Sequence, residues 1–313
     1  MASVFLRAVT VNSVLAGSSS LLLNALLIYM IWFRSTADLK NYRTFFLIYN
    51  AIDVCFTFIS LSTHLLMFIH NSDIVFVAAG FITYLGQWPS QMCLIAQIFF
   101  YPFVIAIIPC TYVYRNVKLP PRFIIMLFFV AFFVVLPYII SVFFCRQSTS
   151  ENAVLYEKMV SLMLEVDDPQ GYYYIGGRLI NADFLTAVLA AVIVFIGSYA
   201  VIFFCGFRIV KVLEAHRASA SIVSQQLQQQ LTLVLKIEAV VPLLFFVAPM
   251  LLVIMDVGFG INFGRLSTGL LAVVEWLPAC DAAITLYCVK PYRRGIKNIL
   301  LRMTTAAYAV EPS

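Results

Sequence analysis

Seven long apolar runs, separated by short polar segments, constrain this sequence more than any other feature. A helix needs about 20 apolar residues to cross the hydrocarbon core of a bilayer, and every run reaches that length. The runs cover residues 11–33, 44–70, 91–114, 123–145, 184–207, 231–254 and 266–289. The sequence therefore predicts an all-α membrane protein, with a seven-transmembrane helix bundle in residues 1–289 and a separate tail in residues 290–313.

The composition indicates that lipid is part of the solvent around this chain. Of its 313 residues, 63% are hydrophobic and 11% are charged, and the mean hydropathy is +0.96. A soluble domain carries about 25% charged residues. The net charge is only +5, and the basic residues lie beside apolar runs instead of on one solvated face. We therefore expect no nucleic-acid partner.

The distribution of Lys and Arg predicts the side on which each terminus lies. Most of the 20 basic residues follow the first, third, fifth and seventh runs. Basic residues accumulate on the cytoplasmic side of membrane proteins. We therefore expect the N-terminus outside and the C-terminus in the cytoplasm.

The segments outside the runs carry three further predictions. Residues 146–183 are predicted to be an extracellular loop with a short amphipathic helix from Ser150 through Leu164. Residues 74–85 are too short to span, and we expect an outer loop or interfacial segment there. The tail combines an apolar face with basic neighbours, which predicts an amphipathic helix on the inner membrane surface. That face comprises Ile296, Ile299, Leu300 and Met303.

Two aspartates lie inside predicted spans. Asp53 lies ten residues after Arg43, and Asp281 lies nine residues before Lys290. At 1.5 Å per residue, both lie roughly 14–15 Å inside the cytoplasmic edge. One interpretation is a shared hydrated pocket, with or without a cation, that rearranges on activation. The other is two separate acids, either protonated or bonded to hydroxyls such as those of Ser60 or Thr285.

The last two runs carry further polar residues and prolines. Glu275 lies at least one helical turn from Asp281 and either faces a ligand cavity or bonds within the bundle. Glu238 lies in the sixth run. The prolines weaken their helices, which suits a bundle that changes shape, although static kinks are the alternative. These prolines are Pro242, Pro249 and Pro278.

The cysteines and histidines limit the chemistry that the chain can perform. The seven cysteines show no metal-binding spacing, so we expect no metal site. Cys93 and Cys145 lie near predicted outer ends, where an oxidising exterior allows a disulfide. The three histidines are scattered between two sides of the membrane. That scatter argues against a membrane enzyme.

Three motifs resemble those of nematode serpentine chemoreceptors. The end of the third run, Tyr112-Val113-Tyr114-Arg115, resembles the aromatic-x-Tyr-Arg of the Str superfamily. Residues 225–242 resemble its sixth-helix entry region, with Glu238 where glutamine is usual. Residues 278–293 resemble its seventh-helix signature, with Ala282 where a proline usually follows the aspartate. The chain thus resembles a member of the Str superfamily, of the Srd or a related Str-type class, over essentially its whole length.

The resemblance implies a G-protein-coupled receptor on the cilium of a sensory neuron, in the plasma membrane. Such a receptor binds a small odorant or pheromone from outside and activates a heterotrimeric G protein, without a cofactor. Arg115 would restrain or contact the G protein, although plain anchoring at the inner membrane edge is the alternative. We assign ligand binding to Gln91, Gln97, Phe99, Phe100, Ser267 and Glu275. We assign switching and coupling to Asp53, Tyr114, Arg115, Glu238, Pro242, Pro278, Asp281, Tyr292 and Arg293.

A ligand-gated channel or a transporter with seven helices is the alternative function. Seven-helix chemoreceptor channels have their N-termini inside, opposite to the orientation that the basic residues predict here. A transporter is expected to show internal repeats and paired broken helices, and no repeat is visible between the two halves. A retinal-binding opsin needs a lysine in the seventh helix, and the run 266–289 has none.

Overall fold

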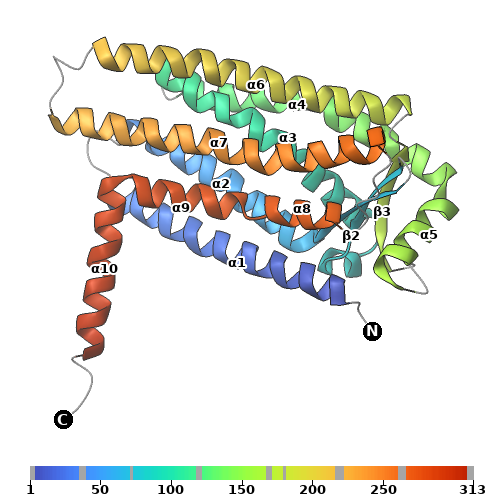
Figure 1. The fold of residues 1–313 in the computed structure, drawn as a ribbon. Coiled ribbons are helices and arrows are strands. Elements are labelled where there is room, and N and C mark those ends of the chain that lie inside the picture. The colour runs from blue at the N-terminus through green and yellow to red at the C-terminus, as the bar shows by residue number, and fades with distance from the viewer. Residues whose placement is uncertain are drawn as a thin grey trace.

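A computed structural model describes residues 4–34, 40–70, 73–117, 122–166, 171–178, 181–215, 222–259 and 266–308. Long helices run back and forth between the two ends of an elongated bundle (Figure 1). We call these the sheet end, where the chain starts, and the tail end, where the last helix leaves the bundle. The bundle helices are α1 (Val4–Phe33), α2 (Lys40–Thr63), α3 (Gln87–Val117), α4 (Arg122–Glu151), α6 (Ala182–Ala215), α7 (Ile222–Phe259), α8 (Leu266–Val274) and α9 (Leu277–Cys288).

Six helical segments in the described part of the chain are long and apolar enough to cross a membrane. A helix satisfies its own backbone hydrogen bonds, as a chain in lipid requires. The prediction of a largely helical, membrane-spanning protein is confirmed. The predicted span 231–254 lies within α7, which is not among the six, and some of its side chains lie outside the described ones. The six segments are Val4–Phe33, Arg43–Thr63, Gln87–Asn116, Phe123–Cys145, Phe184–Val212 and Leu266–Cys288.

A three-stranded antiparallel sheet, in the order β1–β2–β3, covers the sheet end of the bundle (Figure 1). β1 (Leu65–His70) pairs with β2 (Asp73–Ala78), and β2 pairs with β3 (Tyr173–Arg178). The prediction that the second span continues to residue 70 is wrong, because α2 ends at Thr63. The segment 74–85, predicted to be an outer loop or an interfacial segment, holds most of β2 and the short 3-10 helix η2 (Phe81–Leu85).

Burial on both faces explains why β1 resembles a membrane helix in the sequence. Alternate residues of a strand point to opposite faces. On one face, Leu65, Met67 and Ile69 join the core of the bundle. On the other face, Leu66 and Phe68 join a second apolar cluster. A strand buried on both faces is apolar at every position, so its period cannot be distinguished from that of a buried helix.

The second apolar cluster is completed by α5 (Ala153–Leu164), which contributes Tyr156, Met159 and Val160. The predicted amphipathic helix in the segment 146–183 is therefore present. It begins after Asn152 rather than at Ser150, since α4 continues to Glu151.

Two hydrogen bonds tie β3 to α4. The Thr149 hydroxyl donates to the Gly176 carbonyl at 2.7 Å and accepts from the Gly176 amide at 2.9 Å. Neither Cys93 nor Cys145 forms a disulfide. The disulfide that the sequence allowed between them is not formed in the structure, although both side chains pack in the same apolar cluster beneath the sheet.

The last predicted span is divided into two helices. α8 ends at Val274 and α9 begins at Leu277, with Glu275 and Trp276 between them. Pro278 lies in the first turn of α9, where its missing N–H interrupts no helical hydrogen bond. It therefore follows a break in the helix and does not kink a continuous one.

The tail forms α10 (Lys290–Tyr308), which turns away from the bundle (Figure 1). Ile296 and Ile299 pack against a cluster that contains the fully buried Tyr292, while Lys297 is exposed. This division agrees with the predicted amphipathic face. The side chains of Leu300 and Met303 lie outside the described ones.

Candidate functional site

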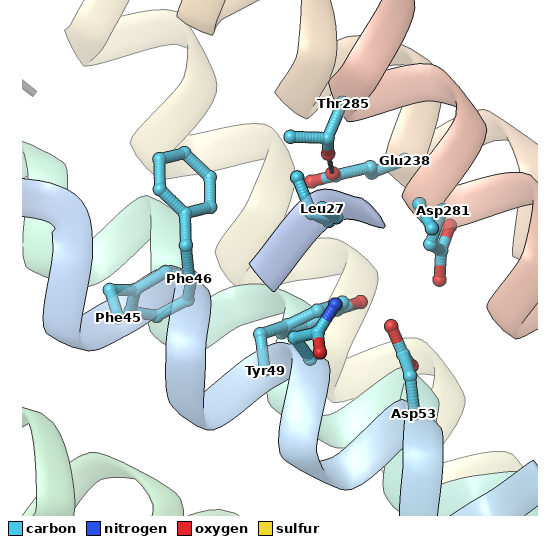
Figure 2. A pocket seen from close by; sticks show the side chains of 10 residues that line it. Leu27, Phe45, Phe46, Tyr49, Asp53, Glu238, Asp281 and Thr285 are labelled. Carbon is cyan, nitrogen blue, oxygen red and sulfur yellow. Dashed lines mark hydrogen bonds between the residues drawn. The ribbon is translucent and has the colours of Figure 1, made fainter. Parts of the chain in front are cut away.

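Three carboxylates from three different helices line one small pocket inside the bundle (Figure 2). Asp53 comes from α2, Glu238 from α7 and Asp281 from α9. Figure 2 shows the carboxylates of Asp53 and Asp281 pointing toward each other. We call this the carboxylate pocket. Its lining residues are Leu27, Phe45, Phe46, Tyr49, Asn50, Asp53, Glu238, Asp281, Ala282 and Thr285.

The two aspartates of the carboxylate pocket are poorly satisfied. Asp53 is 3% exposed and Asp281 is 2% exposed. Among the described residues, both carboxylate oxygens of Asp281 and Oδ1 of Asp53 lack a hydrogen-bond partner. The free volume of the pocket is about 10 Å³, room for about one water molecule. The geometry therefore favours the shared pocket over two separate acids.

The hydroxyls that the sequence offered as partners of the aspartates bond to the two glutamates instead. Thr285 donates to Glu238 Oε1 at 3.1 Å, and Ser60 donates to Glu275 Oε1 at 3.2 Å. In the described part of the chain, no group of three acidic, His or Cys side chains is arranged to hold a metal ion. The Thr285 hydroxyl thus satisfies Glu238 and is not available to the two aspartates of the pocket.

Sequence reasoning missed two polar residues of the carboxylate pocket, Tyr49 and Asn50. Asn50 donates to Asn24 Oδ1 of α1 at 2.7 Å, and Asn24 donates to the Pro278 carbonyl at 3.3 Å. These bonds join α1, α2 and α9 beside the aspartates. The sequence could have indicated Asn50 as a pocket residue, because it precedes Asp53 by three positions and so lies on the same helix face.

Glu275, predicted either to face a ligand cavity or to bond within the bundle, anchors the break between α8 and α9. Its Oε2 accepts from Ser13 at 2.7 Å and from Asn12 at 3.4 Å, both on α1. Its Oε1 accepts from Ser60 on α2. Asn12 also accepts from the indole N–H of Trp276 at 3.1 Å. Glu275 therefore bonds within the bundle.

The other predicted ligand residues divide among different neighbours. Gln91 and Gln97 are buried on α3. Phe99 stacks on Phe103 at 5.0 Å between ring centroids, whereas Phe100 stacks on Phe56 of α2 at 5.5 Å. The Ser267 hydroxyl donates to the Met67 carbonyl of β1 at 2.7 Å. The structure thus brings Gln97, Phe100 and Glu275 toward α2, and it directs Ser267 to the sheet.

Arg115 links α3 to α7 at the tail end. Its Nη2 donates to the Gln228 carbonyl at 2.8 Å, to Gln228 Oε1 at 2.9 Å and to the Thr232 hydroxyl at 2.8 Å. One turn earlier, the Tyr112 hydroxyl donates to the Leu235 carbonyl at 2.9 Å. From α6, the Tyr199 hydroxyl donates to the Ala239 carbonyl at 2.8 Å. These contacts hold the tail-end half of α7 against α3 and α6.

The remaining switch candidates lie apart from these contacts. Tyr114 is buried and stacks on Phe45 of α2 at 6.1 Å. Pro242 is buried on α7. Tyr292 is fully buried at the start of α10, whereas Arg293 is exposed and lies over the Tyr287 ring at 5.5 Å.

Comparison with known proteins identifies the family. The family described as serpentine type 7TM GPCR chemoreceptor Str matches residues 10–297. The chain belongs to this family. The receptor is also similar to serpentine receptor class delta-32 of Caenorhabditis elegans, with 23% identity over 289 residues, which is 90% of this chain and 83% of that protein. The predicted resemblance to nematode serpentine chemoreceptors of the Str superfamily is confirmed. The family is one of receptors and not of enzymes.

Proposed function

We propose that this receptor binds a small odorant or pheromone from the extracellular side and activates a heterotrimeric G protein at its tail end. The observation that carries the proposal is the set of hydrogen bonds from Arg115 and Tyr112 to α7. Releasing them would free the tail-end half of α7 and uncover a surface between α3, α6 and α7. A receptor that signals needs a resting state and an active state that bind different partners. Here these are the states with α7 held and with α7 released.

The proposed orientation has the N-terminus outside and the tail in the cytoplasm. The excess of basic residues around the tail-end segments supports it. A glycosylation sequon in an extension added before residue 1 tests it directly, because residue 5 itself lies inside α1, too close to the membrane to be modified. Modification of that site supports the orientation, and an unmodified site in a correctly inserted protein would contradict it.

The proposed ligand-binding residues are Gln91, Gln97, Phe99, Phe100, Ser267 and Glu275. Support comes from the apolar cluster beneath the sheet, which surrounds this part of α3 and reaches α8 and α9. The position of the sheet over this region means that a ligand arriving from outside must pass beside it or displace it (Figure 1).

The carboxylate pocket is the proposed switch between ligand and G protein. It lies between α2, α7 and α9. A rearrangement that brings water or hydrogen-bond donors to its unsatisfied aspartates would stabilise them. Its proposed switching groups are Asp53, Glu238 and Asp281. Pro242 and Pro278 lie on α7 and α9, the helices that supply Glu238 and Asp281.

Guanine-nucleotide exchange on co-expressed G protein is the test of this function. Cells expressing the full chain are screened with volatile compounds and ascarosides, and active compounds are retested with Arg115→Ala and with residues 211–230 deleted. Both changes should abolish ligand-dependent exchange or raise basal exchange. Arg34→Ala is the matched control, because Arg34 is an exposed basic residue at the end of α1, outside the proposed coupling surface.

Two outcomes would contradict the proposed coupling. Exchange that is unchanged in both variants would show that this surface does not couple. Ligand-gated ionic current without nucleotide exchange would favour the channel instead. Imaging of a tagged chain in sensory neurons tests the proposed location in the plasma membrane of the cilium.

A further inference from the structure

Gln97 places a whole amide group inside an apolar environment. It is 0% exposed in the middle of α3. The residues on either side of it in the helix, including Leu94 and Ile98, belong to the apolar cluster beneath the sheet. A buried amide needs partners for both its N–H groups and its carbonyl oxygen.

The neighbouring hydroxyl determines which end of the amide is satisfied. Gln97 Nε2 donates to Ser60 Oγ at 3.3 Å and to the Tyr101 hydroxyl at 3.5 Å. The single hydroxyl proton of Ser60 is donated to Glu275 Oε1 at 3.2 Å. Ser60 therefore has only lone pairs to offer to Gln97, so the N–H₂ end of the amide faces it and the carbonyl end faces elsewhere.

The carbonyl end of Gln97 is left without a donor. Among the described residues, Gln97 Oε1 has no hydrogen-bond partner, and the same is true of Gln91 Oε1, about 9 Å earlier along α3. Leaving a buried acceptor unsatisfied costs about 1–3 kcal/mol. The neighbouring Glu275 already accepts three hydrogen bonds. Gln97 Oε1 and Gln91 Oε1 are thus buried acceptors that no donor of the described residues reaches.

The surrounding walls are apolar and adaptable. Phe56 and Phe100 stack beside this part of α3, and Met67 and Met92 border the same cluster. Methionine side chains repack easily around a guest. A ligand that fits such a site has an apolar body and one polar head.

We infer that the receptor recognises a small apolar molecule through a hydroxyl or amine group, which donates a hydrogen bond to Gln97 Oε1. This inference rests on the proposed function and specifies its ligand class. Ethers and ketones of equal length lack the donor and leave the acceptor unsatisfied. Since a factor of ten corresponds to about 1.4 kcal/mol, we expect donor-bearing ligands to be at least about tenfold more potent.

Matched compounds test this inference on the full-length receptor. Straight-chain alcohols and primary amines are compared with methyl ethers and ketones of the same length. Two readouts are used: nucleotide exchange in membranes, and the thermal shift of the purified receptor. Gln97→Leu should lower the potency of alcohols and amines about tenfold and leave ethers and ketones unchanged. Gln87→Leu, on the exposed first turn of α3, should change neither group.

The outcomes separate the ligand class from the signalling function. Equal potency of acceptor-only compounds, or potency of alcohols unaffected by Gln97→Leu, would overturn the ligand class and leave coupling intact. Binding of alcohols or amines without nucleotide exchange would support the ligand class and overturn coupling. Failure of every alcohol and amine in both readouts would overturn the inference.

Discussion

Thr268 in the first turn of α8 and Met67 in β1 are joined by two hydrogen bonds. The Thr268 hydroxyl donates to the Met67 carbonyl at 2.6 Å and accepts from the Met67 amide at 3.2 Å. β1 is an edge strand, and this contact satisfies backbone groups that β2 does not reach. The sheet and α8 are therefore attached, and α8 leads directly to Glu275.

Thr268→Val removes this attachment while keeping the shape of the side chain. The variant leaves the buried Met67 amide without its partner, so we expect it to lower the free energy of unfolding by about 1–3 kcal/mol. Thermal unfolding of the purified receptor measures the change. Ser141→Ala is the control, because the Ser141 hydroxyl bonds back to Pro137 of its own helix. Equal stability of both variants would show that the attachment contributes nothing.

Tyr112→Phe and Tyr199→Phe should each raise basal nucleotide exchange. Each substitution removes one hydrogen bond to the backbone of α7, worth about 0.5–1.5 kcal/mol. If those bonds favour the resting state, exchange without ligand rises by about two- to tenfold. Tyr84→Phe, at a side chain that is 91% exposed, is the control. Basal exchange that stays constant in both variants would contradict the proposed restraint on α7.

Asp53→Asn and Asp281→Asn should not act additively. Two buried carboxylates that share one pocket destabilise each other, so neutralising either one relieves the same repulsion. We expect a coupling free energy of about 1 kcal/mol in the double-mutant cycle, measured by thermal unfolding. Strict additivity would show that the two acids do not interact. Both single variants should also reduce ligand-dependent exchange, because the pocket is the proposed switch.

Gly80→Ala should be strongly destabilising. A Cβ at this position would lie 2.2 Å from the Ser62 carbonyl oxygen, which belongs to the backbone and cannot move away cheaply. We expect a loss of about 2–3 kcal/mol in the free energy of unfolding. Gly171→Ala is the matched control, since no atom lies within 4 Å of its added Cβ. A stable Gly80→Ala variant would contradict the close approach of the backbone after β2.

His64 should make the junction between α2 and β1 sensitive to acid. Burial lowers the pKa of His64 from the ordinary value of 6.5. Its neutral form therefore contributes stability above pH 6.5, and this contribution is lost as the pH falls through the lowered pKa. His64 has a φ of 42°, and asparagine tolerates that conformation.

His64→Asn removes the titration without straining the backbone. Unfolding temperatures of the wild type and the variant are compared at about pH 8 and about pH 5. The wild type should lose more stability than the variant on acidification. A pH dependence that is the same in both proteins would show that His64 does not titrate in this way.

Periodicity and length predicted the helical part of this receptor but not where helices stop. The apolar run 44–70 contains no Gly or Pro that would end a helix near residue 64. Strand β1 forms because β2 and the Thr268 hydroxyl of α8 satisfy its backbone. The α8 contact comes from a residue 201 positions later in the sequence, which no local pattern can predict. The break between α8 and α9 at Glu275 could not be predicted either. Its carboxylate accepts hydrogen bonds from Asn12 and Ser13, which lie at the other end of the chain.

The sequence by itself determined the apolar spans, the family and the matching level of Asp53 and Asp281 in two helices, because length, hydropathy and helical rise are local properties. Only the tertiary structure decided that Glu238 joins the two aspartates, that Ser60 and Thr285 donate to the glutamates, and that Cys93 and Cys145 form no disulfide. Helix rotation and packing direct each side chain to its neighbour, and neither can be read from the spacing along one helix.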